Sequence, residues 1–268
     1  MTEPELSVLI PVLNWEETLE GTVRRLRAAL AGRDVEVLVV FDITQPEARE
    51  EIEGDAARLA DEYGTRSLFR LNERGFGSAL RFGAQHATGR AVMPVMADLS
   101  DDLEAIPAML SRLASGADVV VGARYVPGGR IVGDTVKQRT SRFYTRLMGL
   151  VTEVRCGDAS NSFKMYRREV WDAVDPVADS FDLSVELVVK AAELGYRIEH
   201  VPVTWENRQA GESKFRVVRE VRNYGRWLGY AMLRMPSRWL IAGGLGVPLL
   251  LRARYRRAPE RRSAALRG

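Results

Sequence analysis

Short apolar segments alternate with longer helical segments through the first half of this 268-residue chain. The segment Val35 to Phe41 is almost continuously apolar. Strands that are apolar on both faces are typical of a parallel sheet covered by helices on both sides. The sequence therefore predicts an α/β fold with a mostly parallel central sheet. We expect strands at 6–12, 35–41, 66–71, 91–96 and 118–122, and helices at 17–30, 46–63, 77–87 and 103–113.

The second half is less regular, because glycines and polar residues interrupt the apolar pattern. A flexible glycine-containing loop is expected at 126–138. Beyond it the periodicity predicts helices at 142–151 and 183–194, strands at 162–167 and 198–204, a loop at 209–214 and a basic amphipathic helix from about Phe215.

The composition fits a globular protein of a reducing compartment. Hydrophobic residues make up 46% of the chain and charged residues 28%, which argues against wholesale disorder. Cys156 is the single cysteine, so no internal disulfide can form. The first residues show no basic segment followed by an apolar run, so no secretory signal is expected. We therefore expect a cytoplasmic location.

Positive charge is concentrated at the C-terminal end. From Glu206 onward the chain has 15 Lys or Arg against 4 Asp or Glu, whereas the preceding part has 24 against 32. Such a segment suits anionic lipid, nucleic acid or an acidic partner. No nucleic-acid-binding motif accompanies it, so we expect no nucleic-acid partner.

The apolar run at 239–251 is shorter than the roughly 20 residues that a membrane-spanning helix needs. A basic amphipathic helix followed by Trp227, Trp239 and a short apolar segment is typical of a helix at the lipid headgroups. The expectation is peripheral association with an anionic membrane at its cytosolic face. The alternative is a C-terminal helix that packs on the domain and continues into a frayed basic end.

An acidic cluster follows the strand predicted at 91–96. Asp98, Ser100, Asp101 and Asp102 lie at its carboxyl end, where open α/β sheets bind their ligands. Oxygen ligands without sulfur favour Mg²⁺ or Mn²⁺, and Mg²⁺ is commonly held by one or two carboxylates and substrate phosphates. The alternative is that these residues only begin the next helix.

Seven short motifs occur in a fixed order, and together they resemble the family 2 inverting glycosyltransferases of the polyprenyl-phosphate sugar synthase type, such as dolichol-phosphate mannose synthases. The similarity covers about Leu6 to Phe215. The motifs are Leu6 to Asn14; Gly75-Phe76-Gly77; Ala97-Asp98; Gly122-Ala123-Arg124-Tyr125; Asp158 with Ser160 and Phe163; Glu186-Leu187 with Lys190; and Arg208 with Gly211, Ser213 and Lys214.

The resemblance implies a GT-A-like nucleotide-sugar-binding domain at 1–215 and a basic, membrane-surface region at 216–268. It implies transfer of a sugar, with inversion, from a nucleotide-diphosphate sugar to a polyprenyl phosphate, with Mg²⁺ or Mn²⁺ as cofactor. The donor would be bound by Pro11, Asn14, Glu16, Asp42, Gly75 and Gly77. The glycines would admit its diphosphate to a helix N-terminus, unless they only form a tight turn.

The remaining roles follow from the same resemblance. Asp98 would bind the metal, with Ser100 and Asp101 beside it. Arg208 and Lys214 would belong to a lid that closes on the departing diphosphate. The acceptor phosphate would be held by Arg124, Lys137, Arg139 and Ser141, although either of Lys137 and Arg139 could be only a solvated basic residue.

A phosphate acceptor is already ionised near neutral pH, so positioning and charge stabilisation would suffice for catalysis. A hydroxyl acceptor would need a carboxylate base. Asp158 and Glu186 are the candidates for that base, or for binding the sugar hydroxyls, or for capping a helix.

Three positions depart from the family pattern. Phe41-Asp42 stands where an Asp-Asp pair is usual, Met96-Ala97-Asp98 replaces Asp-Ala-Asp, and Trp15 replaces a Glu. Asp101 or Asp102 could compensate. Two other functions therefore remain open: a soluble glycosyltransferase for a small-molecule or saccharide hydroxyl, and a catalytically inactive protein that binds nucleotide-sugar.

Overall fold

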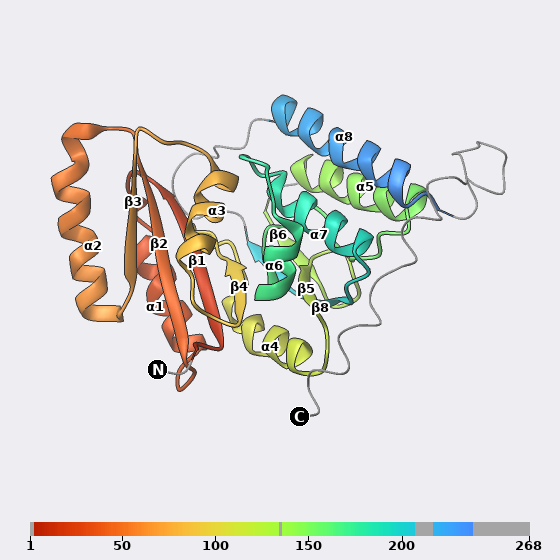
Figure 1. Ribbon diagram of the computed structural model, residues 1–268. Coiled ribbons are helices and arrows are strands. Elements are labelled where there is room, and N and C mark those ends of the chain that lie inside the picture. Colours follow the sequence, from red (N-terminus) through yellow and green to blue (C-terminus); the bar gives the residue numbers. More distant parts are fainter. Residues whose placement is uncertain (1–2, 134–135, 207–216, 238–268) are drawn as a thin grey trace.

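The computed structural model describes residues 3–133, 136–206 and 217–237, and of residues 136–137 and 217–219 the backbone alone (Figure 1). Within these residues the strands are β1 (Leu6–Leu13), β2 (Val35–Ile43), β3 (Arg66–Leu71), β4 (Ala91–Pro94), β5 (Val119–Ala123), β6 (Arg130–Val132), β7 (Lys164–Arg167), β8 (Ile198–Pro202) and β9 (Thr204–Glu206). The α-helices are α1 (Leu19–Ala29), α2 (Arg49–Tyr63), α3 (Phe76–His86), α4 (Ile106–Ala114), α5 (Val136–Val151), α6 (Arg168–Val174), α7 (Leu183–Glu193) and α8 (Val217–Arg234), and the 3₁₀ turns are η1 (Pro46–Ala48) and η2 (Leu103–Ala105).

The central sheet has seven strands in the order β3-β2-β1-β4-β7-β5-β8. All neighbouring strands are parallel except that β7 runs antiparallel to both β4 and β5. The carboxyl ends of β1, β2, β4 and β5 therefore open at one edge, where ligands bind in open α/β sheets. A second sheet pairs β6 with β9.

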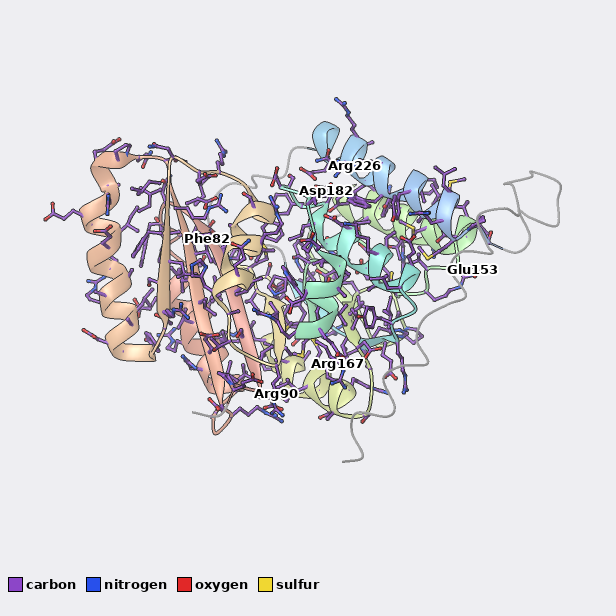
Figure 2. The ribbon with its side chains drawn as sticks, in the orientation of Figure 1. Phe82, Arg90, Glu153, Arg167, Asp182 and Arg226 are labelled. Atoms are coloured by element: carbon purple, nitrogen blue, oxygen red, sulfur yellow. The ribbon has the colours of Figure 1, made fainter. Side chains whose placement is uncertain are left out.

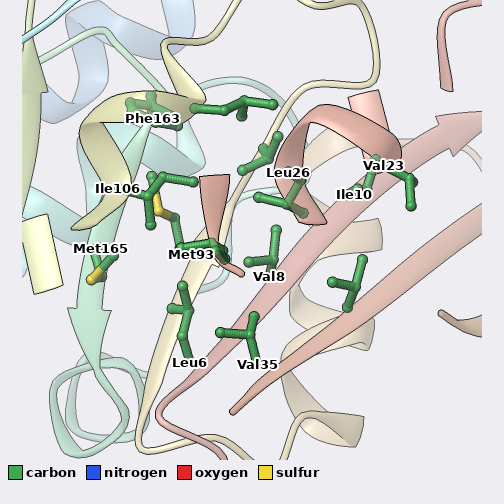
Figure 3. Packing of buried hydrophobic residues seen from close by; sticks show 14 of the residues in the cluster. Leu6, Val8, Ile10, Val23, Leu26, Val35, Met93, Ile106, Phe163 and Met165 are labelled. Atoms are coloured by element: carbon green, nitrogen blue, oxygen red, sulfur yellow. The ribbon is translucent and has the colours of Figure 1, made fainter. Parts of the chain in front are cut away.

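Helices cover both faces of the sheet, as the doubly apolar strands predict. Alternate residues of β1, namely Leu6, Val8 and Ile10, pack with α1, α2 and α4 on one face (Figure 3). Leu9 points to the opposite face, where α3, α6 and α7 cover the sheet and α5 and α8 pack farther out. Each such fully buried aliphatic side chain stabilises the fold by about 1.5–3 kcal/mol.

The predicted strands and helices of the first half are confirmed, with small shifts at their ends. The strand expected at 91–96 ends at Pro94. The second half differs more: α5 begins at Val136 rather than at 142, β6 lies in the segment expected to be a loop, and α6 was not predicted. The strand expected at 198–204 is divided into β8 and β9.

Helix α8 packs on the domain beside α5 and α7. The hydroxyl of Tyr144 donates to the carbonyl oxygen of Tyr224 at 3.0 Å, which joins α5 to α8. Asp182, just before α7, accepts hydrogen bonds from Arg226 at 3.0 Å and from the indole of Trp227 at 2.9 Å (Figure 2). Helix α8 therefore packs on the domain, while membrane association and the domain boundary at 215 remain predictions.

In the described part of the chain no helix combines the length and apolar character needed to cross a bilayer. The apolar run at 239–251 lies outside the described residues.

Candidate active site

The acidic cluster lies in the turn that follows β4. The hydroxyls of Thr18 and Thr22 hold this turn by donating to the carbonyl oxygen of Ala97 at 2.8 and 2.9 Å. Asp98 and Asp101 are 4% and 5% exposed, so the turn directs both carboxylates inward. Helix α1 therefore anchors the metal-binding candidates to the sheet edge.

Asp101, rather than Asp102, shares the buried environment of Asp98. One oxygen of Asp101 accepts the backbone N–H of Met96 at 2.8 Å. Burial, reinforced by the charge of Asp98 and opposed by that hydrogen bond and by Arg124, raises the pKa of Asp101 to about 7. Asp102 instead accepts the N–H of Thr204 at 2.8 Å and so attaches β9 to the turn.

These residues fit a divalent cation only in part. The described residues include no group of three or more His, Cys, Asp or Glu side chains that could hold a metal ion by themselves. Asp98, Ser100 and Asp101 nevertheless offer hard oxygen atoms within one buried turn. Such a set suits Mg²⁺ or Mn²⁺ if substrate phosphates complete the coordination.

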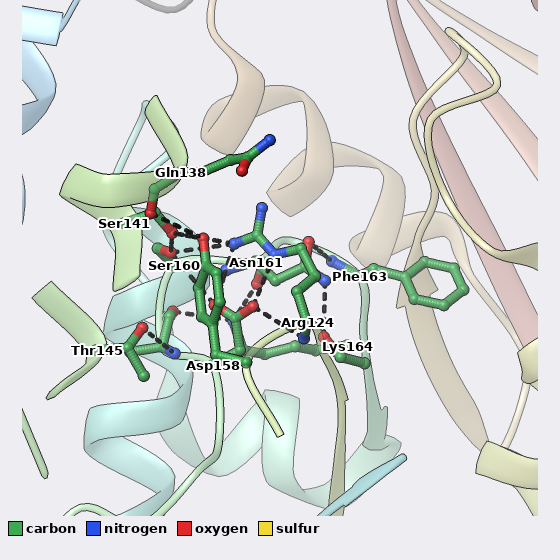
Figure 4. Close-up of polar contacts among 12 residues, drawn as sticks. Arg124, Gln138, Ser141, Thr145, Asp158, Ser160, Asn161, Phe163 and Lys164 are labelled. Atoms are coloured by element: carbon green, nitrogen blue, oxygen red, sulfur yellow. Dashed lines mark hydrogen bonds and ion pairs between the residues drawn. The ribbon is translucent and has the colours of Figure 1, made fainter. Parts of the chain in front are cut away.

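Arg124 lies at the end of β5, and Asp158 holds it in one orientation (Figure 4). Its Nε donates to Asp158 at 2.7 Å and its Nη2 donates to the other carboxylate oxygen at 3.1 Å. Nη2 also donates to the hydroxyls of Ser141 and Ser160, both at 3.2 Å. Among the described residues Nη1 has no hydrogen-bond partner. A carboxylate and two hydroxyls thus fix one side of a charged guanidinium.

The electrostatics of this pair keep both groups ionised. Burial acts to raise the pKa of Asp158, but the charge and hydrogen bonds of Arg124 outweigh it, so the pKa lies below its usual value. Burial acts to lower the pKa of Arg124, and Asp158 reverses that effect and raises it. A carboxylate with a lowered pKa is a poor proton acceptor, so Asp158 is suited to holding Arg124 rather than to general-base catalysis.

Tyr125, for which the sequence predicted no role, belongs to the same group of residues. Its hydroxyl donates to Ser141 at 2.8 Å, and the guanidinium groups of Arg124 and Arg142 lie 5.1 and 5.6 Å from the centre of its ring. The Arg-Tyr dipeptide was the available signal. A single dipeptide cannot show, however, that α5 brings Ser141 and Arg142 to it.

On the predicted donor side, Asp42 is the second-last residue of β2 and lies in a buried polar network. Its carboxylate accepts the N–H of Gly75 at 3.0 Å and forms an ion pair with the buried Arg70 at 3.1 Å. Burial raises the pKa of Asp42 to about 6 despite the opposing effect of Arg70. Arg70 was not predicted as a site residue, because its position inside β3 gives no functional signal.

Gly77 is required by close packing. An added Cβ would lie 2.5 Å from the carbonyl oxygen of Ala178, and the Gly77 N–H donates to the carbonyl oxygen of Asp179 at 2.9 Å. The backbone amides of Gly75 and Gly77 therefore both have partners within the chain. Their contact with a donor remains a prediction.

Two departures from the family pattern lie against each other. The rings of Trp15 and Phe41 stack with centres 5.9 Å apart and planes 3° from parallel, and Phe69 continues the stack at 5.5 Å. Asn14, with a φ of 56°, accepts hydrogen bonds from the N–H and the hydroxyl of Thr44 at 2.9 and 3.1 Å. An apolar pair thus occupies the position of two acidic residues, while Asn14 ties the ends of β1 and β2 together. Pro11 lies within β1, and Glu16 follows Trp15 in the loop after it.

Glu186 is buried and caps a loop. Its carboxylate accepts the N–H groups of Val177 and Ala178 at 3.0 and 2.7 Å and pairs with Lys190 at 2.6 Å. Of its three suggested roles, this contact network supports a structural one.

The other predicted site residues have fewer recorded contacts. Arg139 is exposed on α5, and of Lys137 only the backbone is described. Arg208 and Lys214 lie outside the described residues. Their roles remain predictions.

Comparison with known proteins identifies the family. The sequence profile named "Glycosyl transferase family 2" matches residues 7–174, which is more than half of the chain. The chain belongs to glycosyl transferase family 2. The similarity predicted from the seven motifs is thereby confirmed.

Three similar proteins carry dolichol-phosphate or undecaprenyl-phosphate in their names. A dolichol-phosphate mannosyltransferase of Pyrococcus furiosus is 27% identical over 84% of this chain and 65% of its own length. An undecaprenyl-phosphate 4-deoxy-4-formamido-L-arabinose transferase of Enterobacter is 31% identical over 80% of this chain and 64% of its own length. An undecaprenyl-phosphate mannosyltransferase of Micrococcus luteus is 31% identical over 82% of this chain and 92% of its own length. The chain thus spans a little under two thirds of the first two relatives.

Solved structures confirm the GT-A-like fold. Glucosyl-3-phosphoglycerate synthase of Mycobacterium tuberculosis, in complex with UDP, superimposes with a TM-score of 0.60 and 18% identity, covering 84% of this chain and 80% of that one. Another structure of that enzyme contains Mn²⁺, UDP and glucosyl-3-phosphoglycerate, with a TM-score of 0.57 and 17% identity over 86% of this chain and 79% of that one.

Proposed function

We propose that this protein transfers a sugar, with inversion, from a nucleotide-diphosphate sugar to a polyprenyl phosphate at the cytosolic face of a membrane. The observation that carries the proposal is the Arg124 site. There a buried carboxylate fixes a guanidinium from one side, and the hydroxyls of Ser141 and Ser160 surround it. Charge-assisted and neutral donors together suit a phosphate group, and the names of the relatives point to the same acceptor class.

A phosphate acceptor agrees with what the carboxylates do. Asp158 is engaged with Arg124, and Glu186 is engaged with two backbone amides and Lys190. Neither is suited to deprotonate a hydroxyl acceptor. A phosphate is already ionised near neutral pH, so it can attack the anomeric carbon directly, and the chain needs mainly to position it.

The donor would meet the acceptor along the same sheet edge. The charge of Arg124 partly opposes the rise that burial produces in the pKa of Asp101, so the predicted acceptor site and the predicted metal site influence each other electrostatically. Asp98, with Ser100 and Asp101, would hold a divalent cation that neutralises charge on the diphosphate. Arg208 and Lys214 would offset the charge that develops on the leaving group.

The face formed by α5 and α8 suits a membrane surface. Exposed apolar side chains lie on both helices, with Phe143 67% and Leu233 62% exposed, and basic residues accompany them. Aromatic and aliphatic side chains that enter the headgroup region, surrounded by arginines, bind anionic lipid surfaces. The exposed apolar residues are Phe143, Leu150, Val221, Met232 and Leu233; the exposed arginines include Arg139, Arg142, Arg146 and Arg222.

A donor and acceptor screen tests the reaction. The full chain would be incubated with a panel of nucleotide sugars and a short-chain polyprenyl phosphate, with Mg²⁺ or Mn²⁺, and the product measured by mass and its anomeric configuration by NMR. We expect one donor to give a lipid-linked sugar of inverted configuration, and Asp98→Ala to abolish the metal-dependent turnover. Transfer only to hydroxyl acceptors would support the soluble glycosyltransferase, and nucleotide-sugar binding without any turnover would support the inactive binding protein.

Vesicle sedimentation tests the membrane face separately. The full chain should co-sediment with anionic phospholipid vesicles at low salt and less at high salt, because salt screens the arginines. The double variant Phe143→Ser and Leu233→Ser should bind the vesicles more weakly. Val177 is 59% exposed in a loop outside this face, so Val177→Ser should leave vesicle binding unchanged. Equal vesicle binding by the double variant and the control would contradict the assignment of this face.

A further inference from the structure

Lys164 is a fully buried cation at the beginning of β7. It pairs with Val121 of β5, and alternation along β7 places it on the same sheet face as Tyr166, which belongs to the apolar core there. Lysine is almost never fully buried without a partner, because removing its charge from water is costly. Its position therefore requires a specific explanation.

The ammonium group binds backbone carbonyls rather than a carboxylate. Nζ donates to the carbonyl oxygen of Ala159 at 3.0 Å and to that of Asn161 (Figure 4). These two carbonyls belong to the turn at 158–163, which joins Asp158 to β7. Lys164 thus holds this turn in place through two of its carbonyl oxygens.

The same turn determines where Asp158 and Arg124 lie. Asp158 accepts the N–H of Asn161 at 3.2 Å, and the Asn161 side chain donates to the carbonyl oxygen of Gly122 at 2.7 Å, two residues before Arg124. The backbone of Ala159 is tied to α5 through a hydrogen bond to Thr145 at 3.3 Å. Release of the turn would therefore move the carboxylate that orients the guanidinium.

We propose that Lys164 is a positioning residue: by holding the carbonyls of Ala159 and Asn161 it fixes Asp158, and through Asp158 it orients Arg124 to bind the acceptor phosphate. This inference rests on the proposed function. It assigns no contact between Lys164 and a substrate.

The charges around Lys164 give the proposal a pH signature. Burial lowers the pKa of Lys164 to about 8, while Cys156 and Asp158 act to raise it and Arg124 acts to lower it. The Cys156 thiol, whose pKa burial raises to about 11, stays neutral in this range. Lys164 should therefore lose its charge above about pH 8, and the turn should be held less firmly.

Above about pH 8 the contribution of Lys164 to the stability of the fold should increase, whereas its hold on the turn should weaken. A lysine with a lowered pKa in the folded state carries a burial penalty below about pH 8, which is relieved as the pH rises toward its ordinary value of 10.5. If Lys164 had a purely structural role, acceptor binding and stability would change in the same direction with pH. A positioning role predicts that acceptor binding weakens while the contribution of Lys164 to stability improves.

The test compares Lys164→Met and Lys164→Arg with the unmodified full chain. Arg27→Met is a matched control, because Arg27 also holds backbone carbonyls, those of Val35, Tyr63 and Gly64, but at the opposite edge of the sheet. The measurements are the KM for a short-chain polyprenyl phosphate, the KM for the nucleotide sugar, the pH profile, and hydrogen exchange of the Arg124 Nε–H by NMR.

We expect Lys164→Met to raise the acceptor KM at least tenfold, to change the donor KM less than twofold and to accelerate exchange of the Arg124 Nε–H at least tenfold. Lys164→Arg should stay within threefold of the unmodified protein and should extend the alkaline limb of the pH profile by a unit or more, because arginine keeps its charge. Arg27→Met should lower stability without changing the acceptor KM.

Equal effects of Lys164→Met on both KM values, or an unchanged exchange rate at Arg124, would overturn the proposal. So would an alkaline limb that is the same in Lys164→Arg. If the unmodified protein turns over no donor, the proposed function fails, and the exchange measurement still decides whether Lys164 positions Arg124.

Discussion

Replacing Asp158 by asparagine separates its two possible roles, because the side chain keeps its size and loses its charge. In the native protein the carboxylate accepts hydrogen bonds from Nε and Nη2 of Arg124 at 2.7 and 3.1 Å, and Asp158 is fully buried. In Asp158→Asn, an amide N–H₂ group must face one of these donors. Arg124, whose side chain is 12% exposed, then keeps a charge without its counterion.

The expected cost is about 3–5 kcal/mol, since that is typical when one partner of a buried ion pair is removed. This is a large part of the roughly 5–15 kcal/mol that stabilises a folded domain. Urea denaturation at neutral pH, followed by circular dichroism, would measure it. The double variant Arg124→Met and Asp158→Leu should recover most of the loss, because paired apolar groups leave no uncompensated charge.

The pH dependence has a defined sign. Because the pKa of Asp158 is lowered in the folded state, its stabilisation is present above the ordinary value of 3.8 and is lost as the pH falls through the lowered pKa. The difference in stability between native protein and Asp158→Asn should therefore shrink only in strong acid. A loss below 1 kcal/mol at neutral pH, combined with loss of kcat, would refute the reasoning and favour a general base.

Three further changes test other parts of the structure. Asp101→Asn should stabilise the metal-free protein at pH 8 but not at pH 4. Raising the pKa of Asp101 from 3.8 to about 7 corresponds to a penalty on folding on the order of 4 kcal/mol, which exists only when the carboxyl group is ionised. Urea denaturation midpoints at the two pH values measure this difference. Gly77→Ala should destabilise the protein by about 1–3 kcal/mol through overpacking. The same change at the exposed Gly54, where no atom lies near the added Cβ, should stabilise α2 by about 0.5–1 kcal/mol. Thermal unfolding of the two variants provides the comparison. Trp227→Phe removes an N–H donor from the buried Asp182 and should lower the stability of the protein by about 1–3 kcal/mol, measured as a lower Tm. An unchanged Tm would show that this hydrogen bond does not anchor α8.

The sheet of the first half could be predicted because its signal is local. Each of β1, β2 and β4 is a short apolar run between polar segments, and burial on both faces requires that composition. The antiparallel insertion of β7 between β4 and β5 could not be predicted, since its pairing is determined by contacts distant in sequence. Helix α5 begins earlier than expected because residues 136–141 are mainly polar and show no apolar periodicity.

The candidate site shows the same division. Asp98 and Asp101 follow a strand, so the rule that ligands bind at the carboxyl edge was enough to select them, whereas Arg124 was selected through the resemblance to the family. The partnership of Arg124 with Asp158 spans 34 residues, and no local pattern encodes it. The packing of Gly77 against Ala178 was likewise hidden, because glycine at a helix start is equally compatible with phosphate binding and with close packing.

The departures from the family pattern are compensated within the chain rather than being isolated losses. Trp15 and Phe41 stand where the family pattern has acidic residues, and their rings stack on each other. Because both positions changed together, neither one keeps a carboxylate that has lost its partner at the other. Met96 replaces a carboxylate, and its backbone N–H is bound by Asp101, which brings a different carboxylate into the buried environment of Asp98. Paired replacements of this kind keep the sheet edge packed and keep a second buried carboxylate in the turn after β4, so the fold tolerates the departures without an unpaired buried charge at positions 15, 41 and 96.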